Sequence, residues 1–469
     1  MLLLLAGCSL LELKPMIAPC AEPGDPSTVA ESPEASESES DTAVDTDTGS
    51  TCPEPSGEAV EHTANVTNDE VWEGGIEHVL PFDLQVSAGA TLTIEACAIV
   101  SLAPRVTLSI RGESTEGQEA RLVVKGDVDQ IVTVRQHVEG SPWGAIRGFG
   151  AHSLLTFSYA DISGGGADGV VPATIWAAGD NDSQNPDPVL RVNHVTITKS
   201  GGHGVLLDAA GSFMEGSRDL TVTASGSATF PQPVAMFIRP LESLPFGNYL
   251  GNRTDEILVH QSLDVTESQT FPNRGVPIRF FGGRVLVTDP TDPFDEITLT
   301  VEPGLELRFD GALILGGGRG AGNAALIALG TDVAPIIFTS SAEADERQPG
   351  DWPGIWLRTA VGSQLDHVGI KYAGAISGLS SSNCKPIASS DDAALIIGDG
   401  SDEYLPVTAT ILNSTIINSA GHAINAAWTS DSFGPDVTAS NSFGDNVGCT
   451  QTKNRLTAGC GGNEGCLVE

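Results

Sequence analysis

The chain has 469 residues, and its 61 acidic side chains outnumber its 23 basic ones, giving a net charge of −38. This charge repels nucleic acids and anionic bilayer surfaces, so no nucleic-acid partner is expected. Glycine and proline are abundant, at 54 and 28 residues, whereas aromatic residues make up only 5%. The composition is typical of a turn-rich fold with an aliphatic core and argues against a helical bundle.

The first ten residues, MLLLLAGCSL, resemble the end of a bacterial lipoprotein signal peptide. Leu5–Cys8 matches the lipobox, so the resemblance implies cleavage and a lipid anchor on Cys8. The basic segment is missing and the apolar run is short, which leaves open an upstream translation start or a non-functional signal. Ser9 stands where an aspartate would retain such lipoproteins in the inner membrane. The resemblance therefore implies a lipid-anchored protein of the outer membrane or cell surface of a Gram-negative bacterium.

An acidic segment follows. Residues 21–61 carry 12 acids and no lysine, arginine, aromatic, leucine or isoleucine. Such a stretch cannot bury enough apolar area to offset its loss of backbone entropy, and its like charges keep it extended. We predict a disordered tether between the membrane and the folded part. The alternative is an acidic tail that binds cations.

The rest of the chain contains an internal duplication. Three pairs of segments match in order, each about 210 to 220 residues apart, as expected for two copies of one repeat unit: Val86–Glu95 with Val301–Asp310, Trp143–Ile146 with Trp352–Ile355, and Thr196–His203 with Thr415–His422. The unequal separations indicate insertions in loops.

Both copies show short segments rich in β-branched residues, bounded by Gly, Asp, Asn, Ser or Pro, and no long apolar stripe of helical period. Examples are Ala120–Val124, Leu154–Ile162, Leu190–Thr198, Ile297–Val301, Ile336–Thr339 and Thr408–Ile417. An all-β fold follows. Because only one to three turn residues separate several of these segments, stacked coils are favoured over a sandwich.

The second copy resembles right-handed parallel β-helix lipoproteins in its coil motifs. These motifs are Val301–Gly304, Gly330–Thr331 with Pro335–Ser340, Trp352–Ile355 and Ile370–Gly374. The resemblance covers roughly residues 60–450, implies the fold, and carries almost no information about activity. The predicted organisation is a signal peptide, a disordered linker, two tandem β-helix copies and a Cys-rich cap: 1–8, 9–61, 62–255, 256–445 and 446–469. The irregular stretch Leu244–Thr254 is expected to mark the joint between the copies.

The eight cysteines fit an exported protein in a compartment that permits disulfides. Cys449, Cys460 and Cys466 are expected to form disulfides in the C-terminal cap, because their spacing lacks the close ligand pairs of a zinc site. Two further predictions complete this set: Cys384 could join the cap, and Cys52 with Cys97 could link the tether to the first coil.

Matching acidic loops raise the question of calcium. Asp180 with Asp182, and Asp399 with Asp402, open polar insertions at equivalent places in the two copies. Carboxylates at alternate positions can coordinate Ca²⁺, but a solvated acidic loop explains them equally. No other cofactor is expected.

Two short motifs resemble those of polygalacturonases, namely Gly202–Gly204 and Asp391–Asp392. Their order is reversed relative to that family and almost half the chain separates them, so we assign no catalytic residue. His203 recurs as His422, which favours a structural role at a turn over binding. Trp176 is the remaining candidate for a binding surface, although packing is an alternative for every tryptophan.

Two hypotheses about function result. The first is a non-catalytic envelope lipoprotein whose rigid β-helix binds a polysaccharide or an envelope protein. The second is a carbohydrate-active enzyme of unrecognised type, either a lyase or a hydrolase. A groove that brings three or more carboxylates together with a Lys, Arg or His would favour the enzyme.

Overall fold

The computed structural model describes residues 51–469 apart from 116, 168–171, 181–184, 261–263, 289–295, 317–322, 361, 377–391, 399–408, 429–431 and 455–464. Cys8 and the predicted tether up to residue 50 lie outside this range. The described chain is all-β, with one 3₁₀ helix, η1 (Arg239–Ser243), and no α-helix. None of its described helices has the length and apolar character needed to span a bilayer.

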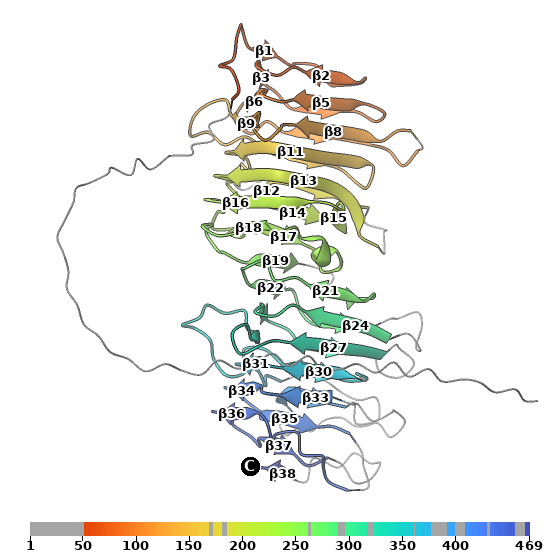
Figure 1. Ribbon diagram of the computed structural model, residues 1–469, viewed down its shortest axis with the longest axis vertical. Coiled ribbons are helices and arrows are strands. Elements are labelled where there is room, and N and C mark those ends of the chain that lie inside the picture. The colour runs from red at the N-terminus through yellow and green to blue at the C-terminus, as the bar shows by residue number, and fades with distance from the viewer. Residues whose placement is uncertain are drawn as a thin grey trace, which may run out of the picture. The chain divides into compact units, whose positions relative to one another are not determined.

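Four sheets contain the strands, and within the unit Gly49–Glu469 these strands stack in chain order (Figure 1). Sheet 1 has twelve strands: β1 (Val60–Glu61), β2 (Glu70–Trp72), β3 (Glu77–Leu80), β5 (Thr91–Glu95), β6 (Ile99–Leu102), β8 (Ala120–Lys125), β9 (Val132–Gln136), β11 (Ser153–Ser163), β13 (Asp187–Thr198), β15 (Gly211–Phe213), β16 (Arg218–Thr223) and β18 (Gly247–Asn248).

Sheet 2 runs through both copies with thirteen strands: β4 (Leu84–Val86), β7 (Leu108–Ile110), β10 (Ile146–Gly148), β12 (Ala173–Ala178), β14 (His203–Asp208), β17 (Val234–Met236), β19 (Ile257–His260), β22 (Ile278–Phe281), β25 (Glu306–Phe309), β28 (Ile336–Ser340), β31 (Val368–Lys371), β34 (Thr415–Ile417) and β36 (Ser442–Gly444).

Two further sheets belong to the second half. Sheet 3 contains β20 (Asp264–Val265), β23 (Val285–Val287), β26 (Leu313–Leu315), β29 (Ile355–Leu357), β32 (Ala393–Ile397), β35 (His422–Ala426), β37 (Gln451–Thr452) and β38 (Cys466–Val468). Sheet 4 contains β21 (Gln269–Phe271), β24 (Glu296–Val301), β27 (Asn323–Leu329), β30 (Ser363–Asp366) and β33 (Ala409–Leu412).

The fold is the parallel β-helix that the sequence predicts. Among the strand pairs of the described chain, only β37–β38 is antiparallel. Side chains alternate between inside and outside, as in β5, where Leu92 and Ile94 are buried and Thr91, Thr93 and Glu95 are half-buried. Stacking at about 4.8 Å per coil pairs each backbone with the coils on either side and buries one continuous aliphatic core.

The two copies form one continuous stack, because β17 of the first half pairs with β19 across the predicted joint. Sheet 1 ends at β18, and sheets 3 and 4 begin at β20 and β21. Between them η1 occupies the place of a strand and contacts both β15 and β21. The predicted joint Leu244–Thr254 thus begins directly after η1, where the cross-section of the rod changes.

The sequence repeat changes face at this joint. His203 lies on sheet 2 whereas its match His422 lies on sheet 3, and Thr196 lies on sheet 1 whereas Thr415 lies on sheet 2. Equivalent segments therefore occupy neighbouring faces of the rod in the two halves. The sequence match alone does not reveal this rotation.

The N-terminal end of the stack is closed by residues that the sequence assigned to the linker. Thr51 donates its backbone N–H to Asp129 O at 2.8 Å, and β1 pairs with β3. Cys52 forms a disulfide with Cys97, the pairing that the sequence suggested. The folded part therefore begins about ten residues before the predicted boundary at residue 62, because the disulfide and the ladder hold residues 51–61 against the first coils.

Replacing Cys52 and Cys97 together with serine is expected to loosen this end. The disulfide closes a loop with a sequence separation of 45 residues, and loss of such a cross-link lowers stability by about 3 kcal/mol. Hydrogen exchange of β1–β3 measures the change. The matched control removes the Cys449–Cys466 disulfide at the other end, which should leave exchange in β1–β3 unaltered. Unchanged protection of β1–β3 in the Cys52/Cys97 variant would contradict the proposed closure.

At the C-terminal end, β38 turns back antiparallel to β37, and Cys449 is bonded to Cys466. Both features cover the last sheet edge, as the predicted Cys-rich cap requires. Cys384 and Cys460 lie outside the described residues.

Candidate binding face

The outer surface of sheet 2 carries two parallel rows of outward side chains. In one row the register places Arg147 beside Trp176 and Leu258 beside Arg279. In the other row it places His260 beside Phe281. We call the surface from β7 to β22 the aromatic–guanidinium face; it is formed by Arg111, Arg147, Phe149, Trp176, Asp208, Phe237, His260, Arg279 and Phe281. Six strand steps of about 4.8 Å make it about 29 Å long.

Arg147 is the central residue of the first half of this face, which runs from β7 to β12. Its guanidinium carbon lies 4.0 Å from the centroid of the Phe149 ring and 3.5 Å from that of the Trp176 ring. Both rings therefore fix the orientation of the guanidinium plane. The N–H groups along the edge of that plane remain able to donate hydrogen bonds. Arg147 Nε is buried without a hydrogen-bond partner, and among the described residues Asp208 acts on Arg147 through its charge without a hydrogen bond.

A second cation stands next to Arg147. The Arg111 guanidinium lies 5.3 Å from the Phe149 ring centroid. Burial lowers the pKa of Arg147; the charge of Asp208 opposes this, and the charge of Arg111 adds to it. Two guanidinium groups thus share one aromatic ring, and among the described residues Asp208 is the carboxylate whose charge acts on Arg147. A bound anion would relieve their repulsion and could accept hydrogen bonds from the fixed guanidinium edge.

The second half of the face adds further aromatic and polar groups. His260 packs edge-on against Phe237 with ring centroids 5.0 Å apart, and its Nε2 is buried without a partner. Burial lowers the pKa of His260, while Asp208 acts in the opposite direction. Arg279 Nε is also unpartnered, and the Phe281 ring is 54% exposed. Between the two halves, Trp176 and Leu258 pack over Leu206 and Ala235.

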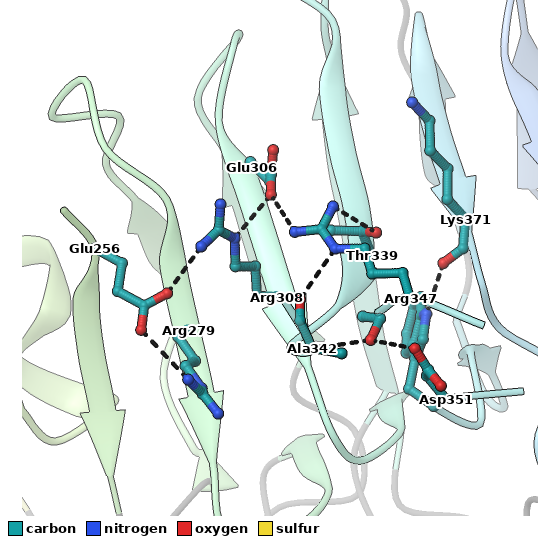
Figure 2. Close-up of polar contacts among 11 residues, drawn as sticks. Glu256, Arg279, Glu306, Arg308, Thr339, Ala342, Arg347, Asp351 and Lys371 are labelled. Carbon is teal, nitrogen blue, oxygen red and sulfur yellow. Dashed lines mark hydrogen bonds and ion pairs between the residues drawn. The ribbon is translucent and has the colours of Figure 1, made fainter. Parts of the chain in front are cut away.

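The outer surface of sheet 2 also carries a charged ladder, which starts at Glu256, directly before β19, and continues beyond β22 (Figure 2). Glu256 contacts Arg279 and Arg308 at 3.5 and 3.0 Å. Glu306 accepts hydrogen bonds from Arg308 at 2.8 Å and from Arg347 at 3.1 Å. Because the Arg347 guanidinium also reaches Ala342 O and Thr339 Oγ1, the loop after β28 is held against this end of the sheet.

The carboxylates of this ladder form ion pairs and hydrogen bonds that stabilise the fold. Burial raises the pKa of the Glu306 carboxyl, but Arg308 and Arg347 outweigh it and hold the pKa below its ordinary value. A general acid needs the opposite shift. Asp351 accepts hydrogen bonds from Ser340 Oγ and Gln348 N, so it too is engaged locally.

His203 has a structural role. It is 3% exposed, and its Nδ1–H donates to Gln232 O at 2.8 Å. The preceding Ser200 hydroxyl donates to His203 O at 2.7 Å, as Ser419 does to His422 O at 2.8 Å, so the recurring motif is a turn that leads into a strand. His422 Nδ1 accepts a hydrogen bond from Cys449 N. Both histidines thus take part in a turn, the role that the sequence analysis favoured, and of the three predicted residues Trp176 lies on the face.

The buried His203 predicts a pH dependence. Burial, with a smaller contribution from His260, lowers the pKa of His203 to about 4, while the hydrogen bond to Gln232 opposes the shift. The unfolded chain binds this proton near pH 6.5, so stability is full above that pH and falls by about 3 kcal/mol as the pH drops toward 4. Thermal unfolding from pH 7 to 4 measures it. In His203→Asn the amide N–H can replace Nδ1–H, and the variant should lose less stability on acidification. An equal loss in both proteins would refute the assignment.

Asp180 closes a turn. Its carboxylate accepts the backbone N–H of Ala151 at 3.0 Å, and its own N–H donates to Asp187 Oδ2 at 2.7 Å. Asp182, Asp399 and Asp402 lie outside the described residues. Within the described residues no group of three or more His, Cys, Asp or Glu side chains could hold a metal ion.

The two polygalacturonase-like motifs are far apart. His203 is on β14 and Asp392 directly precedes β32, and six strands of sheet 2 lie between them in the stack. At about 4.8 Å per coil the two residues are roughly 30 Å apart along the rod, so they cannot act on one bond.

The other tryptophans are packing residues or lie away from the face. Trp72, Trp143 and Trp352 are at most 1% exposed, and Trp356 is 6% exposed on sheet 3. Trp428 packs against the core and donates its Nε1–H to Gly434 O. Sequence reasoning missed Arg147, Phe149 and His260, because only the coil register places them together.

Comparison with protein-family models, with curated proteins and with solved structures finds no match to this chain.

Proposed function

We propose that this protein is a non-catalytic, lipid-anchored envelope protein whose β-helix binds an anionic polysaccharide through the aromatic–guanidinium face. The anchor on Cys8 and the outer-membrane location rest on the lipoprotein-like N-terminus. The observation that carries the binding role is the Arg147 guanidinium held between Phe149 and Trp176 without a carboxylate partner among the described residues.

The chemistry of this site suits uronate carboxylates. A stacked guanidinium presents its N–H groups in one plane, which matches a carboxylate, and neighbouring aromatic rings pack against sugar C–H groups. The chain as a whole is strongly negative. At physiological salt, however, charges more than about 8 Å away are screened, so the local pair Arg111 and Arg147 dominates what a bound ligand meets.

The test is the binding of an oligogalacturonate and of a neutral oligosaccharide of equal length, measured by calorimetry. The intact protein is expected to bind the oligogalacturonate more tightly than the neutral oligosaccharide. Arg147→Ala or Trp176→Ala should lower the affinity for the oligogalacturonate at least tenfold. Arg358→Ala is the matched control, because Arg358 stacks on Trp356 at 4.9 Å on sheet 3, outside the face. Equal affinity of the Arg147 and Arg358 variants would exclude the face as the site.

The enzymatic alternative is addressed in the same experiment. The charged ladder on sheet 2 brings three carboxylates and three arginines together, which is the composition that an active site would need, yet their mutual pairing leaves them engaged. We therefore expect the oligogalacturonate to be recovered at full length after incubation. Chain shortening that is lost in Glu306→Gln would overturn the non-catalytic proposal.

A further inference from the structure

A pocket of about 360 Å³ opens at the joint between the two halves, away from the aromatic–guanidinium face. It lies where η1 replaces a strand between β15 and β21. Its walls include Ser212, Phe213, Arg239, Glu242, Val265 and Gln269. This volume is at the small end of ligand pockets and exceeds the space that a few waters require.

The missing strand explains why the pocket exists. A regular coil would pair its backbone with both β15 and β21, but η1 satisfies these edges with side chains instead. Phe213 N donates to Ser243 Oγ at 3.1 Å, and Thr270 N donates to Glu242 Oε2 at 3.4 Å. The short 3₁₀ helix thus keeps the neighbouring coils apart without filling the space between them.

Gln269 is one of the residues that line this space. Its register partner is Leu299, which is fully buried, so Gln269 occupies a position in an inward-facing row of side chains. Both amide atoms of Gln269, Oε1 and Nε2, are buried and neither has a hydrogen-bond partner. A buried amide left unsatisfied in this way is destabilising, so an apolar residue such as leucine would suit the apoprotein better.

The surrounding groups define the ligand that the pocket suits. Gln269 offers one acceptor and two donors, the Ser212 hydroxyl offers both, and Arg239 adds a cation that already donates to Asp264 O at 3.3 Å. Glu215, Glu242 and Glu267 are exposed and line the same pocket. Three carboxylates against one guanidinium disfavour an anion, whereas hydroxyl groups can donate to the carboxylates and accept from Gln269 and Arg239.

From this geometry we infer that the joint pocket binds one neutral monosaccharide unit, with the Gln269 amide as its central hydrogen-bonding group. The inference goes beyond the proposed function, because the face selects anionic chains through Arg147 and the pocket selects a single uncharged sugar ring. Either site can fail without the other.

The test is saturation-transfer NMR on the full chain with glucose, galactose, mannose, xylose and N-acetylglucosamine, followed by titration of the sugar with the strongest signal. Gln269→Leu is expected to lower the affinity for that sugar at least tenfold. The Tm of this variant should equal or exceed that of the intact protein. Thr270→Val, on the adjacent outward position of β21, should retain binding. Absence of signal for all five sugars, or equal affinity in Gln269→Leu, would overturn the inference.

A charged-sugar comparison tests the rim separately. Glucuronate should bind more weakly than glucose, and Glu215→Gln with Glu267→Gln should narrow this difference by removing two carboxylates at the mouth. Preference for glucuronate in the intact protein would contradict the assignment. Binding of oligogalacturonate to the Gln269→Leu variant should be unchanged, which separates this pocket from the face.

Discussion

Replacing Trp352 with alanine is expected to lower the free energy of unfolding of the second half of the rod by about 4 kcal/mol. Trp352 is fully buried and stacks on Phe309 with ring centroids 5.1 Å apart. Phe309 in turn stacks on Phe280 at 4.8 Å, so the indole ends an aromatic column inside the core. Its Nε1–H donates to Lys371 O at 2.8 Å, and that carbonyl would lose its partner as well.

Two variants separate the packing from the hydrogen bond. Trp352→Phe keeps a ring against Phe309 and loses only the indole N–H and part of the volume, so a loss of about 1–2 kcal/mol is expected. Trp143→Ala is the matched variant in the first half, since Trp143 is equally buried and donates to Ser163 O at 2.8 Å. Hydrogen exchange across β25–β31 and equilibrium denaturation measure the effects.

Because each coil contacts mainly its neighbours, the two alanine variants should act locally. Trp352→Ala should lower protection in β25, β28 and β29, and Trp143→Ala in β7, β10 and β12. A loss of less than 1 kcal/mol for Trp352→Ala, or equal deprotection of both halves, would show that the indole is not part of a locally packed core.

The fold was predictable because its determinants are local. Alternation of buried and exposed residues with period 2, as in Ile297–Val301, identifies strands, and tight turns such as Ser200–Gly202 identify corners. The duplicated turn at His203 and His422 likewise revealed its structural role through recurrence. None of these inferences requires knowing which coil lies beside which.

The binding face depends on the register between neighbouring coils, and this register could not be predicted from the sequence. Arg147 and Trp176 are adjacent in space but separated by a loop and a complete turn of the rod, and loop lengths differ from coil to coil. The rotation of the repeat at η1 has the same origin. A short Arg-Pro-Leu-Glu-Ser segment replaces a strand there, so matched residues of the two copies move to different faces.

Removing the Glu256 carboxylate is expected to destabilise the centre of the rod by about 3 kcal/mol in Glu256→Ala. The side chain is 2% exposed and directly precedes β19. Its two oxygens receive Arg308 Nη1 at 3.0 Å, Arg279 Nη1 at 3.5 Å and Gln232 Nε2 at 3.1 Å. The variant leaves two guanidinium groups without their shared anion. Because both remain about one quarter exposed, the expected loss is at the lower end for a buried ion pair.

Urea denaturation of the intact protein, three single variants and one double variant measures this contribution. Asp310→Asn, which removes an exposed carboxylate after β25, is the control and should change stability by no more than about 0.5 kcal/mol. Glu256→Ala combined with Arg308→Ala should cost less than the sum of the two single changes, because the contact between Glu256 and Arg308 is lost in each single variant and is counted twice in the sum. Strict additivity, or a Glu256→Ala effect as small as that of Asp310→Asn, would show that the ladder contributes no more than surface charges. Arg279 belongs to both the ladder and the aromatic–guanidinium face, and Glu256→Ala removes its carboxylate partner, so this variant should strengthen oligogalacturonate binding near β22, whereas Asp310→Asn should not.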